Sequence, residues 1–239
     1  MTDAVVLLDK KAGITSFTCL NTVKKTVNKK TGHCGTLDKF ATGLLIALCG
    51  KYTKLNQLFM GLDKTYIAKI EFGKETDTLD PEGKIIDTKA LPTFEEIEKK
   101  VKSYVGKIIQ IPPVYSAVHI GGKRSYKLAR QGQNVQPEGR EVEIYRADII
   151  SYDAPFLTIE LNVSKGTYIR SYARDLGRLC SSCAYVKELR RTQIGPFNIY
   201  DAIKSDDINA LATVNEDNSK KIIDMLKEYR DKNEAASIL

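Results

Sequence analysis

A largely apolar run at residues 41–48, ATGLLIAL, places the strongest constraint on how this chain folds. The run is far shorter than the roughly 20 residues that cross a bilayer, and its length suits a buried β-strand. The segment before it, GHCGTLDKF (32–40), holds mostly small and apolar residues around one carboxylate, Asp38. An acid in such surroundings is either a turn-former or a reactive group in a shaped pocket.

Other segments alternate between strand and helix patterns. Strands are expected at residues 5–10, 65–73, 141–153 and 156–164. Helices are expected at 17–28 with Ser16 as N-cap, 53–64, 94–106 with Thr93 as N-cap, within 166–180, and at 221–230. The first helix would bury Phe17, Leu20, Val23 and Val27, and the last Ile222, Ile223, Leu226 and Tyr229. Residues 76–83 read as a turn, 185–195 as mixed and 215–220 as a polar linker. These patterns predict an α+β fold with a mixed or mostly antiparallel central sheet and flanking helices.

The net charge of +7 is spread unevenly over the chain. Residues 1–60 carry nine Lys against three Asp, and residues 165–191 carry seven Lys or Arg against two acids. Residues 119–136 carry four Lys or Arg and no acid. Basic zones of this kind favour a polyanion such as nucleic acid as partner, although solvated surface lysines would give the same count.

Cysteine and histidine usage disfavours several classes of protein. Five cysteines are an odd number for a disulfide framework, and the single CxxC of Cys180 and Cys183 lacks a second pair for zinc, so reduced structural thiols are expected. Cys34 directly follows His33, and neighbours in sequence rarely face each other, which disfavours a Cys/His hydrolase. No signal peptide is apparent, so a cytoplasmic location is expected.

Three further side chains are candidates for the chemistry of Asp38. A buried carboxylate stays ionised at neutral pH only beside a cation, and Arg170, which lies between aromatic residues, is a candidate. A phosphate contact or plain surface charge would explain Arg170 equally well. Tyr66 and Tyr168 suit a core or interface position, and a ring packed on a nucleobase gives the same pattern.

Five ordered segments resemble the TruB family of pseudouridine synthases. GHCGTLDKFATGLL (32–45) is similar to the family's catalytic segment, GHxGTLDxxATGxL. The other four segments are LLDKKAGITS (7–16), KTYIAKIEFGKETDTLDPEG (64–83), QIPPVYSAVHIGGKRSYKLARQG (110–132) and SKGTYIRSYARDLG (164–177). The resemblance implies the pseudouridine synthase fold with an RNA-gripping insertion, and isomerisation of a tRNA uridine at position 55 of the TΨC loop.

The resemblance also implies roles for single residues. Asp38 matches the catalytic aspartate, which attacks the flipped uridine at either the sugar or the base. Tyr66 matches the tyrosine that stacks on the target base, and Arg170 the arginine that pairs with the aspartate. His33 matches the histidine that enters the RNA loop. Tyr168 is a further candidate for RNA contact, and no cofactor or metal is implied.

Weaker assignments follow from the same resemblance. Leu189 lies where the family has an apolar residue near the target ring, and Lys10 matches a lysine whose role is either RNA contact or structural. The expected phosphate contacts of the insertion are Lys123, Arg124, Lys127 and Arg130. The chain departs from the family at Lys11 and Lys39, which replace prolines, and at His119, which replaces a common lysine.

We therefore expect a catalytic domain over residues 1–212, with the insertion at about 110–140, and a short linker and helix over 213–239 in place of a full C-terminal RNA-binding domain. The expected partner is the TΨC arm of tRNA, with no membrane, no obligate protein partner and a monomeric state. Two alternatives remain open: a tRNA-folding chaperone that binds RNA without turnover, and another RNA-modifying enzyme with an Asp base, such as a base hydrolase.

Overall fold

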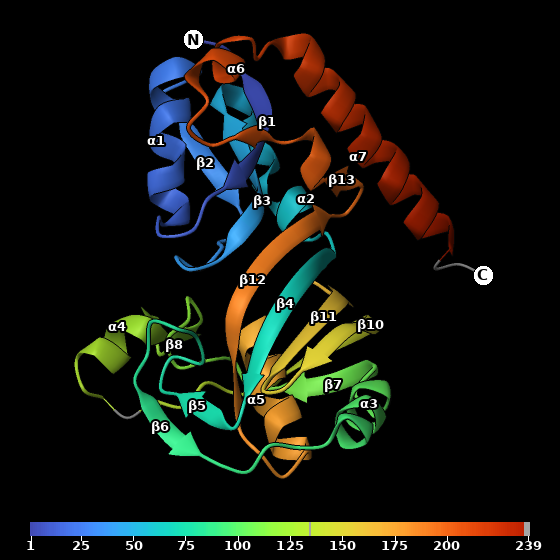
Figure 1. Ribbon diagram of the computed structural model, residues 1–239. Coiled ribbons are helices and arrows are strands. Elements are labelled where there is room, and N and C mark those ends of the chain that lie inside the picture. Colours follow the sequence, from blue (N-terminus) through green and yellow to red (C-terminus); the bar gives the residue numbers. More distant parts are fainter. Residues whose placement is uncertain (134, 237–239) are drawn as a thin grey trace. The chain divides into compact units, whose positions relative to one another are not determined.

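A computed structural model describes residues 1–133 and 135–236 and divides the chain into two compact units (Figure 1). Unit 1 comprises residues 1–66 and 190–239, and unit 2 comprises residues 67–189. Residue 134, within the expected insertion, and residues 237–239, within the expected C-terminal segment, lie outside the described residues. No helix in the described part of the chain is long and apolar enough to span a membrane.

The main sheet is mixed and has the strand order β14-β1-β3-β12-β4-β11-β10-β7. Its parallel pairs are β1 with β14 and β12 with β3, whereas β1 with β3 and β10 with β11 are antiparallel. Two of its strands, β4 (Lys64–Phe72) and β12 (Ala184–Ile194), contribute residues to both units. The predicted α+β fold with a mixed sheet is confirmed.

Unit 1 is built on strands that are covered on both faces. Its other strands are β1 (Ala4–Lys10), β2 (Thr31–Cys34), β3 (Thr42–Cys49), β13 (Phe197–Asn198) and β14 (Ile203–Lys204). Its helices are α1 (Ser16–Thr26), η1 (Gly50–Leu55), α2 (Asn56–Met60), η2 (Ile199–Asp201), α6 (Ile208–Ala212) and α7 (Glu216–Ala236). Figure 1 shows α1 and α7 on opposite sides of the β1–β3 strands.

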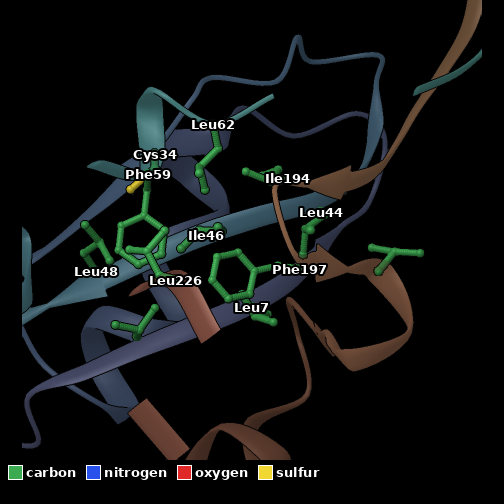
Figure 2. Close-up of a cluster of buried hydrophobic side chains, with 12 residues drawn as sticks. Leu7, Cys34, Leu44, Ile46, Leu48, Phe59, Leu62, Ile194, Phe197 and Leu226 are labelled. Atoms are coloured by element: carbon green, nitrogen blue, oxygen red, sulfur yellow. The ribbon is translucent and has the colours of Figure 1, made fainter. Parts of the chain in front are cut away.

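Burial on both faces explains the apolar run of β3. Leu45 and Ala47 join a core with α1 and α6, whereas Leu44, Ile46 and Leu48 join a second core. Figure 2 shows this second core, in which Ile46 lies near Phe59, and Phe59 and Phe197 have ring centroids 5.8 Å apart. A strand buried on two sides needs no polar alternation, so the predicted buried strand at 41–48 is confirmed.

The C-terminal helix is longer than the sequence predicts. Residues 215–220 were expected to be a linker, but α7 begins at Glu216. The side chain of Asn215 accepts the N–H of Asn218 at 2.9 Å as a cap, and Glu216 and Asp217 favour the positive end of the helix dipole. The predicted apolar stripe of Ile222, Ile223, Leu226 and Tyr229 is confirmed, because all four pack against the second core.

Helix α1 begins one residue away from its predicted cap. Thr15 caps the helix by accepting the N–H of Thr18 at 3.0 Å, so the expectation for Ser16 is wrong. Ser16 instead turns inward and is buried together with Cys19, Leu20 and Val23. Phe17 was expected on this buried face, but its side chain is 65% exposed. The buried stripe is therefore shifted by one residue at the start of the helix.

Unit 2 carries the remaining elements. Its strands are β5 (Lys74–Thr76), β6 (Ile85–Thr88), β7 (Gly106–Gln110), β8 (His119–Ile120), β9 (Lys123–Arg124), β10 (Arg140–Asp153) and β11 (Phe156–Val163). Its helices are α3 (Phe94–Ser103), α4 (Ser125–Arg130) and α5 (Ile169–Leu179). The strands predicted at 141–153 and 156–164 are confirmed, as is Thr93, which caps α3 through a reciprocal pair of hydrogen bonds with Glu96.

Three further expectations differ from the structure. The helix expected at 53–64 is shorter, because η1 and α2 end before Gly61 and β4 begins at Lys64. The helix expected at 94–106 ends at Ser103, and β7 begins at Gly106, whose φ of +106° suits glycine. The mixed segment 185–195 is strand β12. Its many charged residues obscure the alternation of apolar and polar side chains that would predict a strand.

The packing of α7 can be tested by substitution. Leu226→Ala should lower the free energy of unfolding by about 2–4 kcal/mol, because the side chain is buried in the second core. The neighbouring Met225→Ala is the control and should change it by less than about 1 kcal/mol, since Met225 is exposed. Urea unfolding measures both; equal effects would show that α7 does not hold Leu226 in the core.

Candidate active site

The loop that carries Asp38 connects β2 to β3 and is fixed by a serine of α1. The hydroxyl of Ser16 accepts the N–H of Leu37 at 2.8 Å and donates to the carbonyl of Leu37 at 2.9 Å. Both residues are buried, so the two bonds form away from water. One side chain thus bonds both the N–H and the carbonyl of the residue that precedes the candidate nucleophile.

Lys10 holds the other side of the same loop. It is fully buried at the end of β1, and its ammonium donates to the carbonyls of Lys11, Ile14 and Lys39 at 2.9, 2.8 and 3.4 Å. The N–H of Gly13 also donates to the Lys39 carbonyl, at 2.9 Å. This geometry favours the structural role of Lys10, because its charge is directed at backbone oxygens.

Arg191 of β12 supports the loop from its remaining side. It is buried, and its guanidinium donates from Nη2 to the carbonyl of Gly35 at 2.9 Å and from Nε to that of Leu44 at 2.8 Å. Gly43 makes this approach possible, since a Cβ there would lie 2.2 Å from the carbonyl oxygen of Arg191. Gly43 also has a φ of +109°, which other residues rarely adopt.

Asp38 and Tyr66 are the candidate reactive residues of unit 1. The side chain of Asp38 is half-buried, and its backbone carbonyl accepts the N–H of Ala41 at 3.2 Å in a turn. The turn-former reading of Asp38 is therefore compatible with a reactive one, because the backbone makes the turn. Tyr66 lies in β4 with its side chain almost fully buried.

His33 lies in β2, five residues before Asp38, and is half-buried. Burial, and then the positive charges of Arg191 and Lys24, lower the pKa of its imidazole, which is therefore neutral at pH 7. Its Nδ1 atom is buried and has no hydrogen-bond partner among the described residues. Burial raises the pKa of the adjacent Cys34 thiol to about 12, which argues further against a Cys/His hydrolase.

Arg170 belongs to unit 2, where an aspartate holds it. It lies in the first turn of α5, and Nη1 forms an ion pair with Oδ2 of Asp80 at 3.3 Å. Nη1 also donates to the carbonyl of Thr78 at 2.8 Å, and Nη2 to that of Tyr115 at 3.0 Å. Asp80 is itself fixed in its turn by the hydroxyl of Thr78 at 2.6 Å. These bonds fix the direction of the guanidinium.

Tyr168 immediately precedes α5 and is clamped at its backbone. The side chain of Gln110 accepts the N–H of Tyr168 at 2.8 Å and donates to its carbonyl at 3.2 Å. The guanidinium of Arg140 lies 4.9 Å from the centre of the Tyr168 ring. Leu189, the last residue of unit 2 in β12, is buried.

The four basic residues expected to contact phosphate gather on one short stretch of unit 2. Lys123 and Arg124 form strand β9, and Lys127 and Arg130 lie on α4. All four are exposed, as phosphate contacts must be. In the described part of the chain, no three His, Cys, Asp or Glu side chains are grouped so that they could hold a metal ion.

Comparison with known proteins decides the family. The family model for the N-terminal domain of TruB family pseudouridylate synthases matches residues 23–169, more than half of the chain. The chain belongs to the TruB family of pseudouridylate synthases. This class of enzyme is an isomerase. The model for the tRNA pseudouridylate synthase B C-terminal domain matches residues 170–229.

Individual relatives agree with the family model. The chain is 44% identical over 237 residues to a tRNA pseudouridine synthase B of Borreliella burgdorferi, covering 98% of this chain and 83% of the relative. It is 49% identical over 206 residues to that of Borreliella afzelii, covering 84% of this chain and 73% of the relative.

Solved structures share the fold. A chain from a Cbf5-Nop10-Gar1 complex has a TM-score of 0.64 at 29% identity, covering 82% of this chain and 50% of its own. A chain from an H/ACA RNP bound to a substrate RNA containing 2'-deoxyuridine has a TM-score of 0.61 at 26% identity, with 82% and 48% covered. This chain therefore spans about half the length of these structures. They carry the predicted pseudouridine synthase fold.

The structure adds three polar residues that sequence reasoning did not assign to the site. Ser16 and Arg191 anchor the Asp38 loop, and Asp80 holds Arg170. Ser16 and Asp80 stand in segments that resemble the family, and this was the available signal. Asp38 belongs to unit 1 and Arg170 to unit 2, and the pairing between them stays a prediction.

The buried pair of Asp80 and Arg170 predicts a stability effect. Asp80→Asn should lower the free energy of unfolding by about 3 kcal/mol, because it removes the carboxylate that compensates a buried guanidinium. Asp77→Asn in the same turn is the control. Asp77 is exposed and accepts the N–H of Lys84, so its loss should be about 1 kcal/mol or less. Comparable urea midpoints for the two variants would contradict the inferred importance of the pair.

Proposed function

We propose that this chain isomerises a uridine of tRNA to pseudouridine, at position 55 in the TΨC loop. The relatives named above are tRNA pseudouridine synthases B, and one related structure holds a substrate RNA. In this reaction the glycosidic bond from C1' to N1 breaks, the ring rotates, and a bond from C1' to C5 forms. The C5 proton leaves and N1 gains one, so the formula of the nucleotide is unchanged.

Asp38 is the proposed nucleophile of this reaction. The observation that carries the assignment is its place in a loop whose backbone is bonded on both sides of it by buried side chains: Ser16 bonds Leu37, and Lys10 bonds Lys39. A fixed backbone limits the positions that the carboxylate can adopt. It therefore holds the carboxylate closer to the geometry needed for attack. Whether the attack falls on the sugar or on the base, the same placement is required.

Arg170 and Tyr66 are the proposed helpers of Asp38. A guanidinium beside the carboxylate would keep it ionised, and hence nucleophilic, at neutral pH. In this proposal Asp80 acts as a positioning residue, because it fixes the direction of Arg170. Tyr66 would stack on the target base and assist removal of the C5 proton, and Leu189 would line the apolar side of the ring.

His33 is the proposed substitute for the departing base in the RNA loop. Extruding a base from its stack costs roughly a few kcal/mol, which a side chain that fills the gap partly recovers. A neutral imidazole suits this place because it stacks without carrying a charge into the loop.

The exposed basic residues of unit 2 are the proposed grip on the RNA arm. Lys123, Arg124, Lys127 and Arg130 would contact phosphates, and binding should weaken steeply with salt. Tyr168 would contact RNA beside them, held in place by Gln110. No cofactor or metal enters the proposed chemistry, and the enzyme would act as a monomer without an obligate protein partner.

Turnover by Asp38 can be tested with tRNA that carries tritium at C5 of uracil. Wild-type protein should release tritium, and Asp38→Asn should lower the rate at least about 1000-fold, because the amide keeps the volume but is not a nucleophile. Binding of tRNA to the variant should stay within about threefold, since no phosphate contact is lost. The matched control is Asp206→Asn, an exposed acid of the same unit.

Three outcomes would contradict the proposal. Tritium release by Asp38→Asn at the wild-type rate would mean that another residue is the nucleophile. Binding of tRNA by the wild type without tritium release would favour the chaperone. A change in RNA mass would indicate base hydrolysis, because isomerisation leaves the mass unaltered. Mapping the product should place pseudouridine at position 55.

A further inference from the structure

A second basic surface, on unit 1, is not used by the proposed mechanism. Four lysines surround the C-terminal end of α1, and we name them the α1 basic patch: Lys24, Lys25, Lys29 and Lys30. Three of them line a hollow of about 610 Å³ together with Thr2, Val27 and Asn28. Lys25, Lys29 and Lys30 are exposed, and Lys24 is half-buried.

The charges of the α1 basic patch are not neutralised by the protein. Among the described side chains, no carboxylate lies within ion-pairing distance of any of the four ammonium groups. Four other lysines of unit 1 differ, because Lys11, Lys51, Lys220 and Lys227 each have an acidic partner. Concentrated, uncompensated positive charge raises the local potential and attracts a polyanion.

The backbone that displays these lysines is fixed. Asn28 is buried, and its side chain donates to the carbonyl of Thr2 at 3.2 Å and accepts the N–H of Lys30 at 3.0 Å. The N–H of Thr2 in turn donates to the carbonyl of Val27 at 3.1 Å. The patch therefore loses little backbone freedom when a ligand binds, which favours binding.

The patch adjoins the segment that leads to His33. Lys30 directly precedes β2, and His33 follows three residues later, about 10 Å further along the strand. The charge of Lys24 is near enough to lower the pKa of the His33 imidazole. The exposed ring of Phe17 lies 3.9 Å from the ammonium of Lys24, and an aromatic ring among lysines is typical of surfaces that bind unpaired nucleotides.

We propose that the α1 basic patch binds the phosphate backbone of the RNA strand that adjoins the target loop. The proposal rests on the proposed function, since it takes His33 as the residue that meets the loop. RNA is favoured over an anionic membrane as the partner. The exposed ring of Phe17 beside the patch suits a nucleobase, and the patch adjoins the segment that leads to His33. A membrane surface would need a wider apolar face to insert.

The test is a charge-matched pair of triple variants. K25Q/K29Q/K30Q removes the exposed part of the patch, and K220Q/K221Q/K227Q removes three exposed lysines of α7 in the same unit. Filter binding of unmodified tRNA at several salt concentrations gives Kd and its salt dependence. The patch variant should bind about tenfold or more weakly at 0.1 M salt, and the slope of log Kd against log salt should fall by about two to three.

The control variant and two further measurements separate the possible outcomes. The α7 variant should stay within about twofold of the wild-type Kd, and tritium release at saturating tRNA should be unchanged in both variants. Equal losses of affinity in the two variants, or none in the patch variant, would overturn the proposal. Loss of binding to phosphatidylserine vesicles with tRNA binding intact would also overturn it, in favour of a membrane contact. If the wild type released no tritium, the proposed function would fail while the Kd comparison still decided the role of the patch.

Discussion

The two hydrogen bonds between Ser16 and Leu37 are the interaction on which the candidate site of unit 1 depends. They join the first turn of α1 to the loop between β2 and β3, across 21 residues of sequence. A buried backbone N–H or carbonyl that loses its partner costs about 1–3 kcal/mol, so Ser16 secures the loop at a point where water cannot replace it. Lys10 and Arg191 bond the flanking carbonyls of Lys39 and Gly35 in the same way.

This scaffold explains why small residues surround one acid. The loop is held by side chains that reach its backbone, so its own side chains are not needed for anchoring. Gly43 lets β12 approach closely enough for Arg191 to reach the loop. The carboxylate of Asp38 is then carried by a backbone that is rigid on both sides. In unit 2, Asp80 fixes Arg170 by the same means, a buried polar contact between distant segments.

Local patterns predicted the elements that depend on local physics. The apolar run of β3 and the alternation of β10 and β11 are determined by which faces are buried, and a pattern of hydrophobicity records that. Contacts between distant segments left no such pattern. Ser16 reads as a helix cap because serine favours that position, yet Thr15 takes it and frees Ser16 to bind the loop. β12 escaped prediction because Arg191 is charged and still buried, with carbonyls as its partners. The family resemblance named Asp38, Tyr66 and Arg170, and their roles stay predictions.

The most direct measurement compares two buried serines of unit 1. Ser16→Ala and Ser219→Ala each remove a buried hydroxyl that accepts a backbone N–H, but Ser219 bonds Val5, outside the Asp38 loop. Both variants should lose similar stability, about 1–3 kcal/mol. At saturating tRNA, tritium release should fall about tenfold or more in Ser16→Ala and stay near the wild-type rate in Ser219→Ala. Equal rates in the two variants would show that the anchored backbone does not position the carboxylate.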